Sequence, residues 1–183
     1  MENKRFTAQD LALTSVFCAL WVVLNLILGP LGFSLWNLPI LCDFSVFFTL
    51  LLTVWFTGKF GTASLVGVVG SIVIFMLRAS PHIIGFAISA VLFDLLMLVC
   101  KHKICQKPRN VLTASFATIV SAYFAGVIIG IFFSNRALGW ITIKWALTFW
   151  GILHLMGGII SLLIAFPVIA AMEKANVRKI KSG

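Results

Sequence analysis

The stretch TAQDLALTSVFCALWVVLN, Thr7 to Asn25, opens the first strongly apolar segment of the chain. Small side chains recur in it at spacings of four, three and four residues: Ala8, Ala12, Ser15 and Ala19. At about 100° per residue these positions fall within roughly 60° of one another on a helix. Large apolar residues such as Leu11, Phe17 and Trp21 occupy the other faces. The pattern predicts a helix with one narrow stripe that a neighbouring helix can approach closely.

The composition restricts the chain to the class of integral membrane proteins. Its 183 residues are 61% hydrophobic and 10% charged, and the mean hydropathy is +1.12. A soluble domain of this length cannot bury that much apolar surface. Seventeen Phe and six Trp beside a single Tyr suit a surface that faces lipid, with Trp at the interfaces.

The net charge of +9 does not indicate nucleic-acid binding. Most Lys and Arg residues flank the apolar segments, where they set the topology of a membrane protein. Cys18, Cys42, Cys100 and Cys105 form no C-x-x-C pair, so they predict neither a metal site nor a disulfide framework. The N-terminal segment does not resemble a cleavable signal peptide.

The apolar segments predict an all-α integral membrane protein with six transmembrane helices in a single domain, residues 1–183. A helix needs about 20 apolar residues to cross the hydrocarbon core. The third segment is short, and Pro167 is expected to kink or end the sixth. The predicted helices span residues 11–31, 39–56, 62–77, 82–100, 111–133 and 145–172.

The basic residues predict the direction of the chain. With a cytoplasmic N-terminus, eleven Lys and Arg residues lie inside, and only Arg78, Arg136 and Lys144 lie outside. An excess of this kind on the cytoplasmic side is typical of membrane proteins. We therefore expect both termini to be cytoplasmic. The eleven inside residues are Lys4, Arg5, Lys59, Lys101, Lys103, Lys107, Arg109, Lys174, Arg178, Lys179 and Lys181.

The sequence offers little support for an enzyme. It contains no phosphate-binding G-x-x-x-x-G-K-[ST] loop, and its few His and acidic residues show no metal-ligand or acid–base spacing. Asp94 lies within the fourth segment, where an ionisable group is a functional candidate. We expect it to form a structural ion pair with Lys59 or Lys101, and the alternative is a proton relay.

All three outer connections carry polar or charged groups, and the first and third add aromatic rings. A site for a small ring-bearing ligand requires this combination. His154 lies one turn deeper than Trp150 on the same helical face. The alternatives are an ordinary interfacial belt for each Trp and a core position for His154. The candidate ligand-binding residues are Trp36, Asn37, Arg78, His82, Asn135, Arg136, Trp140, Lys144, Trp150 and His154.

Two stretches resemble the substrate-binding S components of energy-coupling factor (ECF) transporters. VFCALWVVLN resembles the opening helix of that family. WNLPILCDFSVFFTLLLTVWFTGKFGTASLVGVVGSIV resembles its following loop, second helix, short turn and Gly-rich third helix. The similarity covers residues 10–75 by motif and the remainder by architecture alone. It implies an ECF S-component-like bundle in the plasma membrane of a prokaryote.

The resemblance implies a binding subunit without enzymatic activity or a cofactor. Such a subunit captures a vitamin or related micronutrient at the outer face, and it delivers the molecule together with a transmembrane T component and two ABC ATPases. The A-x-x-x-A signature that meets the T component corresponds to Ser15 and Ala19, extended by Ala8 and Ala12. Packing of this stripe against residues 62–77 of the same chain, which offer Ala63, Gly67, Gly70 and Ser71, is the alternative.

The chain begins Met1-Glu2-Asn3-Lys4 and lacks the N-terminal Met-His motif of the metal-transporting branch. We therefore expect an organic substrate: thiamine or its pyrimidine precursor, riboflavin, a pteridine, a corrin or a queuosine-type base. Two other classes remain open. One is a small membrane enzyme that acts on a lipid through Asp43, Asp94, His82 and His154, and the other is a proton-coupled secondary carrier that uses Asp94.

Overall fold

The computed structural model describes residues 6–104, 108–134 and 139–177, and within these ranges every regular element is helical. Two composite helices are continuous, one from Pro81 to Cys100 and one from Trp140 to Lys174. The elements are α1 (Ala8–Trp36), α2 (Ile40–Thr57), α3 (Thr62–Arg78), η1 (Pro81–Ile83), α4 (Ile84–Leu96), η2 (Met97–Cys100), α5 (Pro108–Phe133), α6 (Trp140–Trp145), η3 (Ala146–Trp150) and α7 (Gly151–Lys174).

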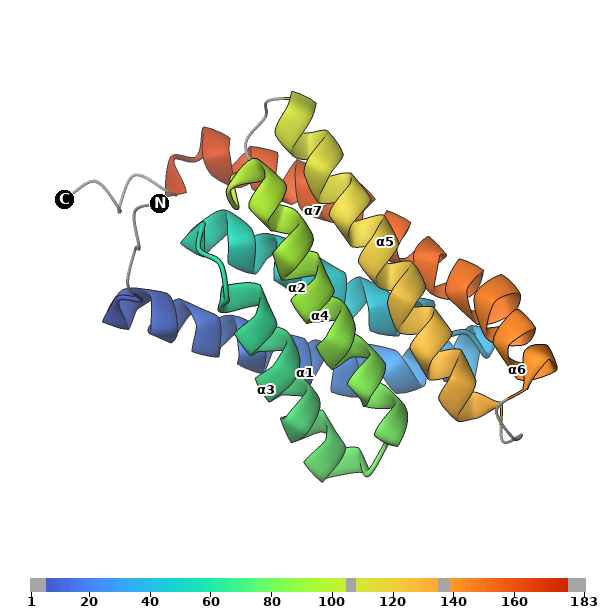
Figure 1. Ribbon diagram of the computed structural model, residues 1–183. Helices are drawn as coiled ribbons and strands as arrows, with labels where there is room; N and C mark the ends of the chain where they lie inside the picture. Colours follow the sequence, from blue (N-terminus) through green and yellow to red (C-terminus); the bar gives the residue numbers. More distant parts are fainter. Residues whose placement is uncertain (1–5, 105–107, 135–138, 178–183) are drawn as a thin grey trace.

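Five of these helical segments are long and apolar enough to cross a membrane, and α3 adds a shorter sixth. This confirms an all-helical chain of the kind that forms a membrane bundle. The helices form a closed ring in the order α1, α2, α7, α5, α4 and α3. Figure 1 shows α3, α4 and α5 side by side, with α3 also against α1.

The two ends of the bundle hold different parts of the chain (Figure 1). The start of α1, the α2–α3 turn and the end of α7 lie at one end, which we call the terminal end. There Lys59 pairs with Asp10, and the indole Nε1 of Trp55 donates to Glu173. The α1–α2 and α3–α4 connections, the end of α5 and the start of α6 lie at the other end, which we call the distal end.

The first helix extends beyond the predicted end at residue 31, because Pro30 does not terminate it. Proline has no N–H, so the carbonyl of Leu26 loses the donor that residue 30 would otherwise supply. The guanidinium of Arg78, at the end of α3, donates to this carbonyl instead. The helix ends at Asn37, whose left-handed backbone (φ 53°) forms the C-cap.

The last predicted helix also differs in its bounds. It begins at Trp140 rather than residue 145, passes through a π-helical segment, η3, and continues to Lys174. Pro167 lies inside α7 and does not end it, in line with the predicted bound at residue 172. Of the two expectations for this proline, an end of the helix is wrong and a kink stays a prediction.

The stripe of small residues on α1 faces away from the bundle. Asp10, Thr14 and Trp21 belong to the buried face, whereas Ala8, Ala12, Ser15 and Ala19 are all exposed. The small residues of α3 already have partners, because Gly67 packs on Ala90 of α4 and Gly70 packs on the ring of Trp21. Packing of the stripe against residues 62–77 is therefore wrong.

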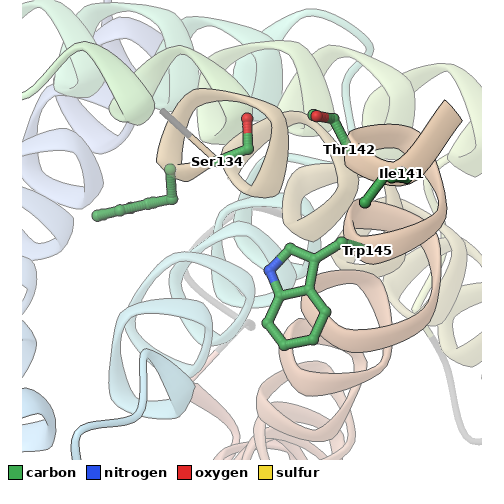
Figure 2. A pocket seen from close by; sticks show the side chains of 5 residues that line it. Ser134, Ile141, Thr142 and Trp145 are labelled. Carbon is green, nitrogen blue, oxygen red and sulfur yellow. The ribbon is translucent and has the colours of Figure 1, made fainter. Parts of the chain in front are cut away.

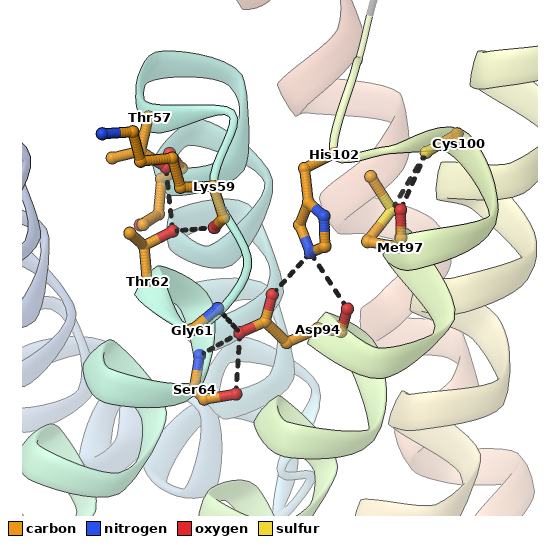
Figure 3. Close-up of polar contacts among 10 residues, drawn as sticks. Thr57, Lys59, Gly61, Thr62, Ser64, Asp94, Met97, Cys100 and His102 are labelled. Atoms are coloured by element: carbon orange, nitrogen blue, oxygen red, sulfur yellow. Dashed lines mark hydrogen bonds and ion pairs between the residues drawn. The ribbon is translucent and has the colours of Figure 1, made fainter. Parts of the chain in front are cut away.

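Asp94 anchors the terminal end, but not through the predicted lysines (Figure 3). Its Oδ2 accepts from the backbone N–H groups of Gly61 (2.8 Å) and Ser64 (3.0 Å) and from the Ser64 hydroxyl (2.7 Å). Its Oδ1 lies 2.8 Å from Nε2 of His102. Gly61 cannot cap α3 with a side chain, so Asp94 supplies the cap from α4. Lys59 is held by Asp10.

Candidate functional site

A pocket of about 360 Å³ opens at the distal end, between the end of α5 and the helix that begins at Trp140. Figure 2 shows Ser134, Ile141, Thr142 and Trp145 around it. Phe133 completes the lining. The pocket therefore combines aromatic and apolar walls with two hydroxyl groups, which is a common make-up for a small-molecule site.

Two glycines of α5, in the sequence GVIIG, allow the last helix to approach closely. A Cβ atom on Gly126 would lie 2.7 Å from the Cβ of His154, and one on Gly130 would lie 2.7 Å from the Cβ of Trp150. Close approach at such a small-xxx-small motif is typical of helix pairs in membranes. Trp150 is also the last residue of the π-helical segment η3. The local sequence thus places Trp150 and His154 deep against α5.

A series of aromatic rings leads from the pocket into the bundle. Phe133, in the pocket wall, is stacked on Trp150 with centroids 5.0 Å apart and planes 9° apart. Trp150 lies 6.0 Å from the ring of His154, and His154 lies 6.1 Å from Phe86. Phe86 in turn meets Trp21 edge to face at 6.5 Å. Contributions from α1, α4, α5, η3 and α7 therefore meet in one contiguous aromatic chain.

His154 is fixed by a buried carboxylate. Its Nδ1 lies 2.9 Å and 2.8 Å from the two carboxylate oxygens of Asp43, and both side chains are almost fully buried. An ionised carboxylate only accepts, so Nδ1 carries the proton of this contact. Gly157 permits the approach, because a Cβ there would lie 2.5 Å from the Cβ of Asp43. Asp43 also lies in the first turn of α2, where the helix dipole favours a negative charge.

Several buried nitrogen atoms near these rings have no hydrogen-bond partner among the residues that the structure describes. Trp21 and Asn25 lie one turn apart on α1, and Trp150 and His154 lie one turn apart on the last helix. We call these four side chains the donor centre. The unpartnered atoms are Trp21 Nε1, Asn25 Nδ2, Trp150 Nε1 and His154 Nε2.

The structure brings together three of the predicted ligand-binding residues: His82, Trp150 and His154. The ring of His82 lies 4.8 Å from that of Phe133. Arg78 donates to the Leu26 carbonyl of α1, and its guanidinium lies near Asn25 at the edge of the donor centre. Four other predicted residues are exposed at the distal end and lie outside the site: Trp36, Asn37, Trp140 and Lys144. The last two, Asn135 and Arg136, lie outside the described residues.

Sequence reasoning missed several members of the site. Asp43 and His154 stand together only in the enzyme alternative, and no sequence spacing predicts their contact, because 111 residues separate them. Phe86, Phe133 and Trp21 are single aromatics among many in an apolar chain. The GVIIG motif is the signal that was available, since it predicts a close helix contact opposite α5.

No family model, curated protein or solved structure matches this chain. The described residues also hold no group of three or more His, Cys, Asp or Glu side chains arranged for a metal ion. The function of the chain is therefore argued from the pocket, the aromatic chain and the donor centre.

Proposed function

We propose that this chain is the substrate-binding subunit of an ECF-type importer in a prokaryotic plasma membrane. In this proposal it captures a vitamin or related organic micronutrient from outside the cell. The observation that carries the proposal is the distal pocket together with the contiguous series of rings that runs from Phe133 in its wall, through Trp150, to the buried His154. An apolar, aromatic pocket close to a few fixed polar groups is what capture of a small ring-bearing molecule needs.

The distribution of charge supports an outward-facing pocket. Among the described residues, the terminal end carries Lys59, Lys101, Lys103, Arg109 and Lys174, whereas the distal end carries Arg78 and Lys144. The side with more Lys and Arg is normally cytoplasmic. The terminal end then faces the cytoplasm, and the pocket faces the outside.

The exposed stripe on α1 supports a partner subunit in the membrane. Helices in lipid associate through close backbone contact, which small residues permit. Ser15 and Ala19 occupy the positions of the family signature, and α1 is the least buried of the five long helices. In this proposal the stripe meets the T component, and two ATPases attached to it supply the energy for release.

A proton-coupled carrier is the second candidate, and the Asp43–His154 pair is the observation that favours it. This pair replaces Asp94 as the relay candidate, because all the contacts of Asp94 serve to hold α3 and His102. The enzyme alternative is less favoured, since Asp43 and Asp94 lie at opposite ends of the bundle.

Mass spectrometry of small molecules that co-purify with the protein in mild detergent tests the proposal directly. A bound micronutrient is expected, and an empty protein after gentle purification would argue against the proposal. Uptake of that micronutrient by cells separates the two candidates. Uptake by the importer requires partner ATPases and is abolished by Ala19→Trp, whereas the isolated Ala19→Trp protein still binds. Uptake without ATPases that collapses with the proton gradient would favour the carrier.

A further inference from the structure

We propose that the donor centre binds the acceptor-rich edge of a heteroaromatic ring. This inference rests on the proposed function, because it names the substrate class of the same site. Its basis is the set of unpartnered nitrogens of Trp21, Asn25, Trp150 and His154. The rings of Trp21 and His154 both contact Phe86 in the interior.

The unpartnered atoms define the chemistry of the ligand. An indole N–H is a donor only, and the amide nitrogen of Asn25 is also a donor. His154 Nε2 accepts when the imidazole is neutral and donates when it is protonated. Buried polar atoms normally find partners, so an interior with three unused donors calls for a group that supplies acceptors. Ring nitrogens and carbonyl oxygens are acceptors of this kind.

Two charged groups lie next to the centre. The carboxylate of Asp43 faces His154. The guanidinium of Arg78 donates to Leu26 and lies near Asn25, because a Cβ atom on Gly29 would be 3.2 Å from Arg78 Nη1 and 4.0 Å from Asn25 Oδ1. A ligand acceptor beside His154 is therefore better neutral than anionic, since the Asp43 carboxylate would repel an anion there.

The stacking of Phe133 on Trp150 joins the pocket wall to the donor centre. A flat ligand can replace the ring of Phe133 on the face of Trp150, because the two planes are only 9° apart. The backbone of η3, directly before the last helix, has the π-helical pattern that is frequent at functional sites. Exchange of one stacked ring for another thus brings the ligand edge toward His154.

Binding of fluorescent probes to the full chain in lipid nanodiscs tests the inference. Lumichrome and methylpterin are heteroaromatic rings with several acceptors, and naphthalene lacks acceptors. Trp150→Phe and Trp21→Phe remove an indole N–H and keep an aromatic ring in its place. Trp55→Phe is the matched control, because it removes an indole N–H at the terminal end, where Trp55 donates to Glu173.

We expect at least one of the two heteroaromatic probes to bind, and we expect naphthalene to bind at least about tenfold more weakly. Loss of one buried hydrogen bond lowers affinity by about tenfold, so Trp150→Phe or Trp21→Phe shows that loss and Trp55→Phe does not. Equal binding of naphthalene, unchanged affinity in both indole variants, or binding of neither heteroaromatic probe would overturn the inference. If a co-purified micronutrient and ATP-dependent uptake accompany such a result, the proposed function stands and only the substrate class is wrong.

Discussion

Arg78 provides the sharpest test of how this bundle is held together, because its sequence and its structure suggest different roles. As an outer basic residue it is a candidate for binding an anionic substrate. In the structure its guanidinium instead donates to the Leu26 carbonyl, which Pro30 leaves without its helical donor. Arg78→Met is therefore expected to lower the stability of the bundle and to leave ligand affinity unchanged.

The size of the effect follows from the contact. A hydrogen bond to a charged group contributes about 1.5–3 kcal/mol, and interhelical bonds in membranes average nearer 0.6 kcal/mol, with a maximum of about 1.7. Since Arg78 is exposed at the distal end, we expect Arg78→Met to cost about 1 kcal/mol. In a Pro30→Ala background residue 30 regains its N–H and can donate to Leu26. The cost of Arg78→Met there falls to about 0.3 kcal/mol, because the helix supplies the missing bond.

Reversible unfolding in mixed micelles measures the four free energies of this double-mutant cycle. Lys144→Met is the control for loss of positive charge at the distal end, and it is expected to change stability by less than about 0.5 kcal/mol. An equal cost of Arg78→Met in both backgrounds would show that Arg78 does not compensate for Pro30. Loss of ligand binding by the folded Arg78→Met protein would instead identify Arg78 as a ligand-binding residue.

Other substitutions test separate contacts. Asp94→Asn breaks a buried contact with His102 and weakens the cap of α3. We therefore expect the free energy of unfolding to fall by about 3 kcal/mol and ligand affinity to be retained. Transport that loses only its proton coupling would instead identify Asp94 as a relay. Gly126→Val would overlap His154 and is expected to abolish ligand binding, measured by co-purification, while Gly58→Ala, in a turn at the terminal end, retains it. Lys59→Met removes the contact between Lys59 and the nearly buried Asp10 and should lower the thermal unfolding temperature measurably. An unchanged temperature would contradict the anchoring role of that pair.

The fold was largely predictable, because the length and apolar character of a membrane helix dominate its sequence. The largest errors in the predicted bounds were at the end of α1 and at the start of the last helix. Pro30 and Pro167 both lie inside helices that continue past them. In a membrane a neighbouring side chain can satisfy the carbonyl that proline frees, as Arg78 does for Leu26. The helix therefore continues where a rule drawn from soluble proteins ends it.

The site was predictable only in part, because it depends on contacts between distant segments. Periodicity correctly directed His154 into the bundle, and it placed Trp150 on the same face. It could not pair His154 with Asp43, or show that Arg78 is used elsewhere. Short-range pattern identifies which face of a helix is buried, whereas the partner across the bundle is set by packing, here by Gly157 and Gly126.

The two buried carboxylates of this chain show why a polar residue in the membrane is not by itself a functional site. Asp94 and Asp43 each contact a histidine, and each lies in a helix that crosses the bundle. Asp94 also receives three further hydrogen bonds from α3 and its preceding turn, which identifies it as a structural anchor. The Asp43 contact orients one nitrogen of His154 and leaves the other buried without a partner among the described residues. Because an unused polar atom in the interior is costly to keep, it is the Asp43–His154 pair that points to a ligand.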